Sequence, residues 1–493
     1  MVKKIILLLC AASTALAQQP VAPANVITLS QKKVAELALQ QGYRTKEVNL
    51  AYQQQKFPLV QTLSAYDWQI NAYTGYELDK RAQLLTSQTI DPHNKIERYD
   101  TLLQFGKRFT TGTAATLELN RLSQSASYDT ALGSNVPPGN QTLDRAGILL
   151  EQAILGNFFG VADRGIVNAA EETYKASEIL RANDLENVVL DAISQFWSAF
   201  IAQENFKEAV AARDRYKKLT DTVRRKTSLG YSNPGDLPQA QAELEAREQI
   251  VKAASTDYLA SVENLLTSLA LDPKSEVKFE MTTALPAIPS LPPINTEDLR
   301  QIRSQKLLVS AADENLTAAK SLSYPTLNFV GRAYTTGVGE KSEDSYSELT
   351  GGSRPDYYVG LKFAYNFGSD FQNERIVYNK LNRDLQQTRL DRAQLEVVDT
   401  NIQAERKAQA AYSIAQSAEK QKTYSEKAVS ELNRSYSQGR TDINNLIQAL
   451  NSQFAAQIKY ITAVGNYHIA LNQWAASRDE LIPDDKTPSE EKK

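Results

Sequence analysis

One short pattern occurs twice in this chain, at an offset of 209 residues, and each copy separates two long helical stretches. The pattern reads glycine, five residues, Asp or Asn, leucine, any residue, glutamine and alanine. Its matched positions are Gly230, Asp236, Leu237, Gln239 and Ala240 in the first copy and Gly439, Asn445, Leu446, Gln448 and Ala449 in the second. Glycine supplies the positive φ that ends a helix, and an Asp or Asn side chain caps the next one. The sequence therefore predicts two helical hairpins with tips at 230–236 and 439–445.

Two of the helical stretches are unusually long. Residues 161–229 and 372–438 contain no proline, and at 1.5 Å per residue each helix would extend about 100 Å. A helix of that length needs neighbours along it, since isolated helices are marginally stable in water. The return helix at 446–478 carries apolar residues at steps of three and four, which indicates a packing stripe. His468 lies on this stripe, and we expect it to be packed rather than to bind a metal ion.

Elsewhere the hydrophobic period changes to two, most clearly from 357 to 368. One face of this stretch carries Tyr357, Val359, Leu361, Phe363, Tyr365 and Phe367. The other face is small or polar, apart from Tyr358. An apolar outer face, a polar inner face and aromatic residues near the membrane surface are typical of a transmembrane β-barrel strand. A soluble sheet that covers a core is the alternative for any single strand of this kind.

Strand-like residues gather in two regions, 65–156 and 324–368. Within the first region, 102–109 and 115–120 resemble a hairpin that the second region lacks. Each chain would supply six strands if this hairpin crosses a membrane, and four if it does not. Three polar stretches are expected to be loops: 79–97, 123–145 and 335–356.

The N-terminus reads as an export signal at 1–17. Two lysines precede an apolar stretch, and Ala15-Leu16-Ala17 is a small-x-small cleavage site. No later stretch has 18 consecutive apolar residues, so membrane contact would have to use strands. The formal charge is −3, from 55 basic and 58 acidic residues without long runs of either sign, which makes nucleic acid an unfavoured partner.

The elements form a tandem repeat of helix, strands, long helix, glycine tip and return helix. The first repeat covers 18–320, with return helices at 237–320 and a proline-rich break at 272–294. The second repeat covers 321–480, and a polar tail follows at 481–493. No nucleophile motif, phosphate-binding loop or supported pair of acids is recognisable, so we expect neither an enzyme nor a bound cofactor or metal.

Together, the signal, the twofold repeat, the paired strands and the glycine-tipped hairpins resemble the TolC-type outer-membrane efflux proteins. The resemblance covers nearly the whole mature chain. It implies a membrane protein of the α+β class, in which a homotrimer shares one β-barrel and a long periplasmic coiled-coil tunnel. It also implies a Gram-negative outer membrane and a passive duct for efflux or type I secretion, with a periplasmic adaptor and an inner-membrane transporter as partners. The alternative is an exported coiled-coil or adhesin-like protein that transports nothing.

The same resemblance assigns roles to the two tips. It places the periplasmic entrance at the acids and amides Asp236, Asp442, Asn445 and Gln448. It places adaptor docking at Leu229, Gly230, Tyr231, Gln438, Gly439 and Arg440. Two of these assignments compete with a simpler one, because Asp236 and Asn445 are also expected to cap the return helices. A cluster at 224–226 (Arg-Arg-Lys) would either pair with acids across subunits or be solvated at the helix end.

Overall fold

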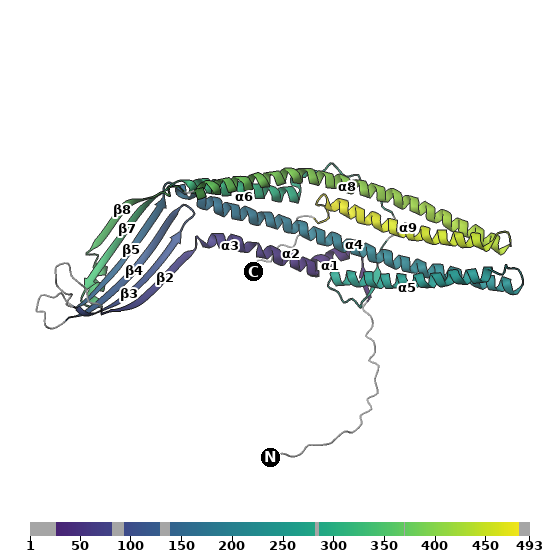
Figure 1. Ribbon diagram of the computed structural model, residues 1–493, viewed down its shortest axis with the longest axis horizontal. Helices are drawn as coiled ribbons and strands as arrows, with labels where there is room; N and C mark the ends of the chain where they lie inside the picture. The colour runs from purple at the N-terminus through teal and green to yellow at the C-terminus, as the bar shows by residue number, and fades with distance from the viewer. Residues whose placement is uncertain (1–25, 81–92, 129–138, 282–284, 369, 483–493) are drawn as a thin grey trace, which may run out of the picture. The chain divides into compact units, whose positions relative to one another are not determined.

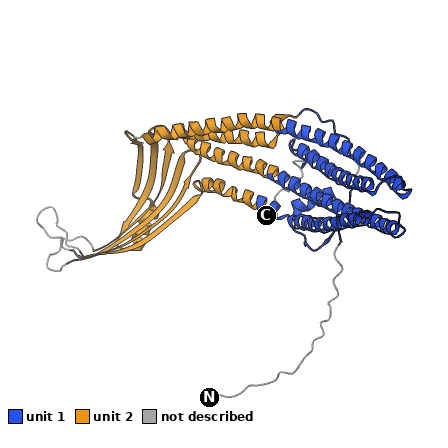
Figure 2. Ribbon diagram, turned by 45° about the vertical axis from the view of Figure 1, so that its right-hand side comes forward, with its two compact units in different colours: residues 1–48, 184–293, 400–493 blue, residues 49–183, 294–399 orange. Residues whose placement is uncertain are grey.

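The computed structural model describes residues 26–80, 93–128, 139–281, 285–368 and 370–482. The expected signal at 1–17 and nearly all of the polar tail lie outside these residues. The described chain forms two compact units, and each draws on both halves of the sequence (Figure 2). One comprises 1–48, 184–293 and 400–493, and the other comprises 49–183 and 294–399. We call the first the tip unit and the second the sheet unit.

The sheet unit contains one antiparallel sheet of six strands (Figure 1). The strands are β2 (Trp68–Asp79), β3 (His93–Arg108), β4 (Thr113–Tyr128), β5 (Asn140–Ala153), β7 (Thr326–Gly339) and β8 (Pro355–Ala364). They pair in that order, so the hairpin of β3 and β4 is part of this sheet, which has six strands among the described residues.

The strands extend further than the sequence indicated. Parts of the expected loops at 79–97 and 123–145 are strand, because polar residues there pair across strands: Ser123 Oγ lies 3.1 Å from Thr142 Oγ1. The expected loop at 335–356 contains the end of β7 and a helix, α7 (Ser342–Gly351). Strand β8 ends earlier than expected, so Tyr365 and Phe367 follow it rather than belong to it.

Helices complete the sheet unit. Besides α7, they are the second half of α2 (Tyr43–Gln54), α3 (Lys56–Ser64), α6 (Arg300–Ser323) and the adjoining parts of α4 (Val161–Ser228) and α8 (Asp370–Ser437). Pro58 lies in the first turn of α3, where its missing N–H leaves no helical hydrogen bond unmade. Ile302 of α6 packs on Leu390 and Val397 of α8, and the Tyr52 and Tyr174 rings of α2 and α4 stack at 5.5 Å.

The tip unit is built mainly from helices. It contains α1 (Gln31–Gln41), α5 (Asp236–Ser268), α9 (Ile443–Ala476) and the remaining parts of α4 and α8. A short parallel pair, β1 (Val26–Leu29) with β6 (Glu276–Phe279), lies beside a core centred on Trp197. The two long helices match the predicted runs to within two residues. Among the described helices, none is both long and apolar enough to cross a membrane.

Candidate functional site

Both helical hairpins of the tip unit end in the same backbone motif. Gly230 has φ +73°, and the N–H of Tyr231 donates to the carbonyl of Lys226 at 2.8 Å. The N–H of Gly230 donates to Thr227 at 3.1 Å, which completes a Schellman motif. Gly439 (φ +74°) repeats this arrangement with equivalent hydrogen bonds. The glycine tips predicted from the repeated pattern are therefore present at both positions.

The second return helix begins earlier than its predicted cap. Asp442 is the N-cap of α9, and its carboxylate accepts from the N–H of Asn444 at 3.1 Å. Asn445 lies inside the first turn instead, where its amide donates to the hydroxyl of Thr441 at 3.1 Å. The prediction that Asn445 caps this helix is wrong because α9 starts three residues sooner.

At the first tip, Asp236 also has a different role from a cap. The N-cap position of α5 is Gly235, and Asp236 occupies the first turn. Its carboxylate accepts from the hydroxyl of Ser232 at 2.8 Å and from the N–H of Asn233 at 3.0 Å. Asp236 therefore closes the loop that precedes α5, and the capping prediction is wrong here too.

The residues assigned to docking are on the surface of the described chain. Leu229 and Tyr231 expose 68% and 80% of their surface. At the second tip, the three residues 438–440 are exposed as well. Two large apolar side chains at the end of a hairpin are unusual for a solvated turn, and exposed apolar groups of this kind often mark contact sites.

A small core joins the four helices just behind the tips. It is formed by Tyr216, Leu219, Val223, Ala240, Tyr436, Ile443, Leu446, Ile447 and Leu450. These residues come from α4, α5, α8 and α9, so the two hairpins pack on each other. Asn445 and Gln448 are exposed on α9, on a side that this core does not use.

Lys226 connects the two hairpins directly. Its ammonium group donates to the carbonyl of Tyr436 at 2.7 Å and lies 3.9 Å from the centroid of that ring. The neighbouring Arg224 pairs with Asp221 on its own helix at 3.1 Å. Lys226 therefore contacts the other hairpin of its own chain. It matches neither alternative given for this cluster, which were pairing with acids across subunits and solvation at the helix end.

A second polar link lies further along the same helices. The amide oxygen of Asn451 accepts from the hydroxyl of Tyr216 and from the guanidinium of Arg247, each at 2.5 Å. Burial raises the pKa of Tyr216 to about 12. A third link joins Gln239 to Asn444 at 2.6 Å. The sequence carried no signal for these three contacts, because their partners lie more than 200 positions apart.

Two of the four predicted entrance residues lie in one neighbourhood. Burial raises the pKa of Tyr436, and the carboxylates of Asp236 and Asp442 raise it further. Both acids therefore act electrostatically on the same ring, although they come from different hairpins. Asn445 and Gln448 lie on α9, after the capping acid.

The sheet has two chemically distinct faces. Strand register places one set of apolar residues on a common face, which we call the apolar face: Trp68, Ile70, Leu103, Phe105, Leu117, Leu119, Ile148, Leu150, Phe329, Val359, Leu361 and Phe363. On β8, Tyr357, Val359, Leu361 and Phe363 are all at least 64% exposed. The alternation predicted for this strand is thus present, without Tyr365 and Phe367.

The opposite face, the polar face, carries hydrogen-bonded and charged side chains. Gln104 donates to Glu118 at 2.9 Å, and Arg145 and Arg332 both reach Asp356, at 3.2 and 3.4 Å. These contacts all join different strands of the sheet. Such a division between faces matches a wall with hydrocarbon on one side and water on the other.

Comparison with known proteins connects these features to a fold. No protein-family model matches the sequence, and no curated protein matches it. Several solved structures do match. The Campylobacter jejuni CmeC outer membrane channel aligns with a TM-score of 0.68 at 14% identity, over 92% of this chain and 87% of CmeC.

Two further channels give the same result. The open state of the Neisseria gonorrhoeae MtrE outer membrane channel has a TM-score of 0.67 at 14% identity, over 93% of this chain and 91% of MtrE. The outer membrane protein VceC from Vibrio cholerae has a TM-score of 0.66 at 12% identity, over 92% and 97%. The fold class predicted from the repeat is confirmed: this chain has the TolC-type fold of outer-membrane channels.

Proposed function

We propose that this protein is the outer-membrane channel subunit of a tripartite efflux or type I secretion system. It would act as a passive exit duct, with energy supplied by a transporter in the inner membrane. The observation that carries the proposal is the match to outer-membrane channels over more than nine-tenths of the chain. The two-faced sheet supports it independently, because its apolar face suits lipid and its polar face suits a water-filled lumen. On this proposal Tyr357, Val359, Leu361 and Phe363 contact lipid.

Assembly into a homotrimer would solve a problem that one chain leaves open. Within the described residues, β2 and β8 each pair on one side only, and unpaired strand edges are not tolerated in lipid. Apolar side chains are exposed on the helices next to both edges: Phe57 on α3, and Tyr378 and Leu381 on α8. Joining the β8 edge of one copy to the β2 edge of the next would cover both, and closed rings are the usual result of such head-to-tail contacts.

The tips would form the periplasmic entrance and the adaptor contact. Leu229, Gly230 and Tyr231, with Gln438, Gly439 and Arg440, supply exposed surface at the ends of the hairpins. Asp236 and Asp442 would give the entrance its negative charge, with Asn445 and Gln448 as neutral neighbours. A photocrosslinker at position 231 or 440 should capture a co-expressed periplasmic adaptor, and one at exposed Asp257 on α5 should not. Equal capture at all three positions would remove the tips from the docking model.

The proposal is tested most simply by location and migration. The protein should fractionate with outer membranes and run as a trimer before heating and as a monomer after it. A soluble exported coiled-coil protein would appear in the periplasm or medium and would show no heat-dependent migration. That result would favour the alternative of a non-transporting surface or structural protein.

A further inference from the structure

We propose that the hairpin of β3 and β4 crosses the membrane as part of the barrel wall. Each chain then supplies six strands, and a trimer closes a barrel of eighteen. This inference rests on the proposed function, since it assumes an outer-membrane trimer. It concerns the number of membrane-spanning strands that each chain supplies, for which the sequence allowed either four or six.

The hairpin is in the middle of the sheet rather than at an edge. β3 pairs with β2 from Lys107 opposite Trp68 to Ile96 opposite Asp79. β4 pairs with β5 over a comparable length, from Thr113 to Ser125. β2 and β5 therefore reach each other only through the hairpin. If the hairpin lay outside the membrane, β2 and β5 would each lose a pairing partner within the membrane.

The apolar face continues across the hairpin without interruption. One row of directly opposed residues crosses all six strands: Ile70, Phe105, Leu117, Ile148, Ala333 and Tyr357. A parallel row includes Leu103 and Leu119, which are opposed to each other. Leu117 and Leu119 expose about two-fifths of their surface, as expected for side chains that face lipid in the assembled channel.

The polar face also continues through the hairpin. Gln104 donates to Glu118 at 2.9 Å, and Asn120 donates to Asp100 at 3.0 Å. Gln104, Glu118 and Asn120 are each next in sequence to a residue of the apolar face. Asp100 lies on the same side of β3 as Gln104. A strand that alternates leucine with paired polar groups is suited to a wall between lipid and water, and it is a poor candidate for an extramembrane flap.

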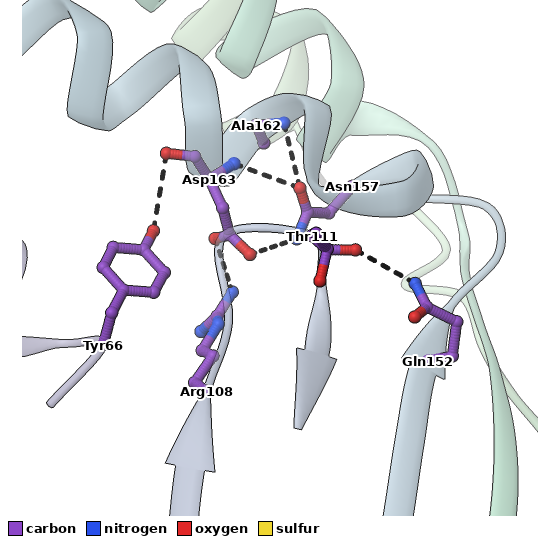
Figure 3. Close-up of polar contacts among 7 residues, drawn as sticks. All are labelled: Tyr66, Arg108, Thr111, Gln152, Asn157, Ala162 and Asp163. Atoms are coloured by element: carbon purple, nitrogen blue, oxygen red, sulfur yellow. Dashed lines mark hydrogen bonds and ion pairs between the residues drawn. The ribbon is translucent and has the colours of Figure 1, made fainter. Parts of the chain in front are cut away.

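The turn between β3 and β4 is fastened to the start of α4 (Figure 3). Arg108, the last residue of β3, pairs with the buried carboxylate of Asp163 at 2.7 Å. Asn157 donates to the same carboxylate at 2.8 Å, and its amide oxygen accepts from the N–H groups of Ala162 and Asp163. Tyr66, just before β2, donates to the carbonyl of Asp163 at 3.5 Å. One buried acid thus links β3 and the approach to β2 with the helix that leaves β5.

Close backbone contact holds the same turn in place. A Cβ added to Gly112, which has φ +71°, would lie 2.8 Å from the backbone nitrogen of Gly160. The carbonyl of Gly112 accepts from the N–H of Ala153 at 3.0 Å, and Thr111 accepts from the side chain of Gln152 at 3.1 Å (Figure 3). The hairpin turn therefore ends at the same level as β5, where the strands give way to helix.

Six strands per chain have a consequence for the exit. Barrel diameter grows roughly in proportion to strand number, so eighteen strands would give a barrel about 1.5 times as wide as twelve. Barrels of this size leave an aqueous channel rather than a side-chain-filled interior. Restriction of solute size would then fall to the helical tips and not to the barrel.

Single cysteines on consecutive residues test the inference. Cys10 is the chain's only cysteine, so a Cys10→Ala background leaves each introduced thiol unique. Leu117→Cys and Glu118→Cys probe the two faces of β4, and Leu361→Cys and Lys362→Cys probe β8 as the matched control. Each purified trimer is labelled with a fluorophore, placed in vesicles and exposed to spin-labelled phosphatidylcholine or to iodide. Leu103→Cys and Gln104→Cys on β3 replace the first pair if Glu118→Cys impairs assembly.

The inference requires the label at 117 to be quenched mainly by lipid and the label at 118 mainly by iodide, with a contrast similar to that between 361 and 362. If 361 and 362 show this contrast while both hairpin labels are quenched by iodide alone, the hairpin lies outside the membrane and the inference is wrong. If 361 and 362 also lack the contrast, the proposed membrane barrel itself fails. The two failures are therefore distinguishable.

Discussion

Lys226 donates a hydrogen bond of 2.7 Å to the main-chain carbonyl of Tyr436, and its ammonium group lies 3.9 Å from the centre of the tyrosine ring. The two residues come from α4 and α8, within a turn of the tip glycines. Each tip glycine is thus closely preceded by a residue that contacts the other hairpin. The relative position of the two tips depends on this contact and on the core behind it.

Replacing Lys226 should weaken the contact between the hairpins. Lys226→Met removes both the hydrogen bond and the cation–π interaction, and Tyr436→Leu removes the ring. In a double-mutant cycle, urea unfolding at fixed protein concentration should give a coupling of about 0.5–2 kcal/mol. Arg225→Met, at the exposed neighbouring position, should change stability by less than about 0.5 kcal/mol. Because Tyr436→Leu keeps the main-chain carbonyl, strictly additive effects of the two changes would show that the cation–π interaction contributes nothing.

Asn451 is expected to stabilise the fold by accepting hydrogen bonds from Tyr216 and Arg247. Asn451→Leu leaves the hydroxyl of the buried Tyr216 and the guanidinium of Arg247 without this acceptor, which should cost about 1–3 kcal/mol in the same unfolding assay. Asn451→Asp keeps an acceptor oxygen and should retain most of the stability. Equal losses in the two variants would show that the acceptor oxygen of Asn451 is not the source of the stabilisation.

The glycine tips offer a matched comparison. Gly230→Ala places a side chain at φ +73°, and the left-handed region costs a non-glycine residue about 1–2 kcal/mol. Gly235→Ala lies five residues away at φ −87°, with open space around its Cβ, and should be neutral or slightly stabilising. Thermal unfolding followed by the helical circular dichroism signal distinguishes them. Similar melting temperatures for the two variants would contradict the tip geometry.

His468 should make the tip unit sensitive to acid. Its ring stacks on Trp197 at 4.1 Å, and burial holds its pKa below the ordinary 6.5. As the pH falls below 6.5, the unfolded chain binds a proton more readily than the folded one, so stability is lost towards the folded-state pKa. His468→Phe keeps the stacking and does not titrate. The loss of stability between neutral pH and about pH 5 should therefore be smaller in this variant, measured by urea unfolding. An identical loss in both proteins would exclude His468 as its source.

Charge at the entrance can be tested without disturbing the loop. Asp236→Asn keeps an oxygen that accepts from Ser232 and Asn233 while it removes the charge. If Asp236 lines the entrance, cation preference or block by cations should fall in bilayer recordings. Asp221→Asn, which removes an exposed acid paired with Arg224, is the control and should leave selectivity unchanged. Unchanged selectivity in the Asp236 variant would assign this acid to the loop alone.

The helices and one strand were predictable because their patterns are local. The long helices at 161–229 and 372–438 follow from uninterrupted helical sequence, and the glycine tips follow from the need for positive φ. The alternation on β8 is visible because its outer residues are uniformly apolar. For the helices and for β8, the period of the apolar side chains determines which face is buried or exposed.

The remaining strands were underestimated for a physical reason. Strands β4 and β5 both continue into the stretch 123–145, which was predicted to be a loop; there Asp144 pairs across the strands with Arg121 at 2.6 Å. Helix α7 lies in a polar stretch and is held by the buried Ser345, which donates to Gly337 and accepts from the N–H of Asp144. Such partners are known only once the strands are aligned.

Long-range contacts at the tips were also beyond prediction. Lys226 and Tyr436 lie 210 positions apart, and nothing in either local sequence identifies the other. The same holds for Asn451, which reads as one more polar residue on a helix. Helix existence is a local property, whereas the contacts between hairpins follow from how the four helices pack.

Single-channel recording of the purified trimer in a planar bilayer tests the central claim most directly. A TolC-type duct predicts discrete conductance steps that appear only after the trimer inserts and that disappear when heating dissociates it. A correctly folded protein that inserts as a trimer and yet passes no ions would contradict the account.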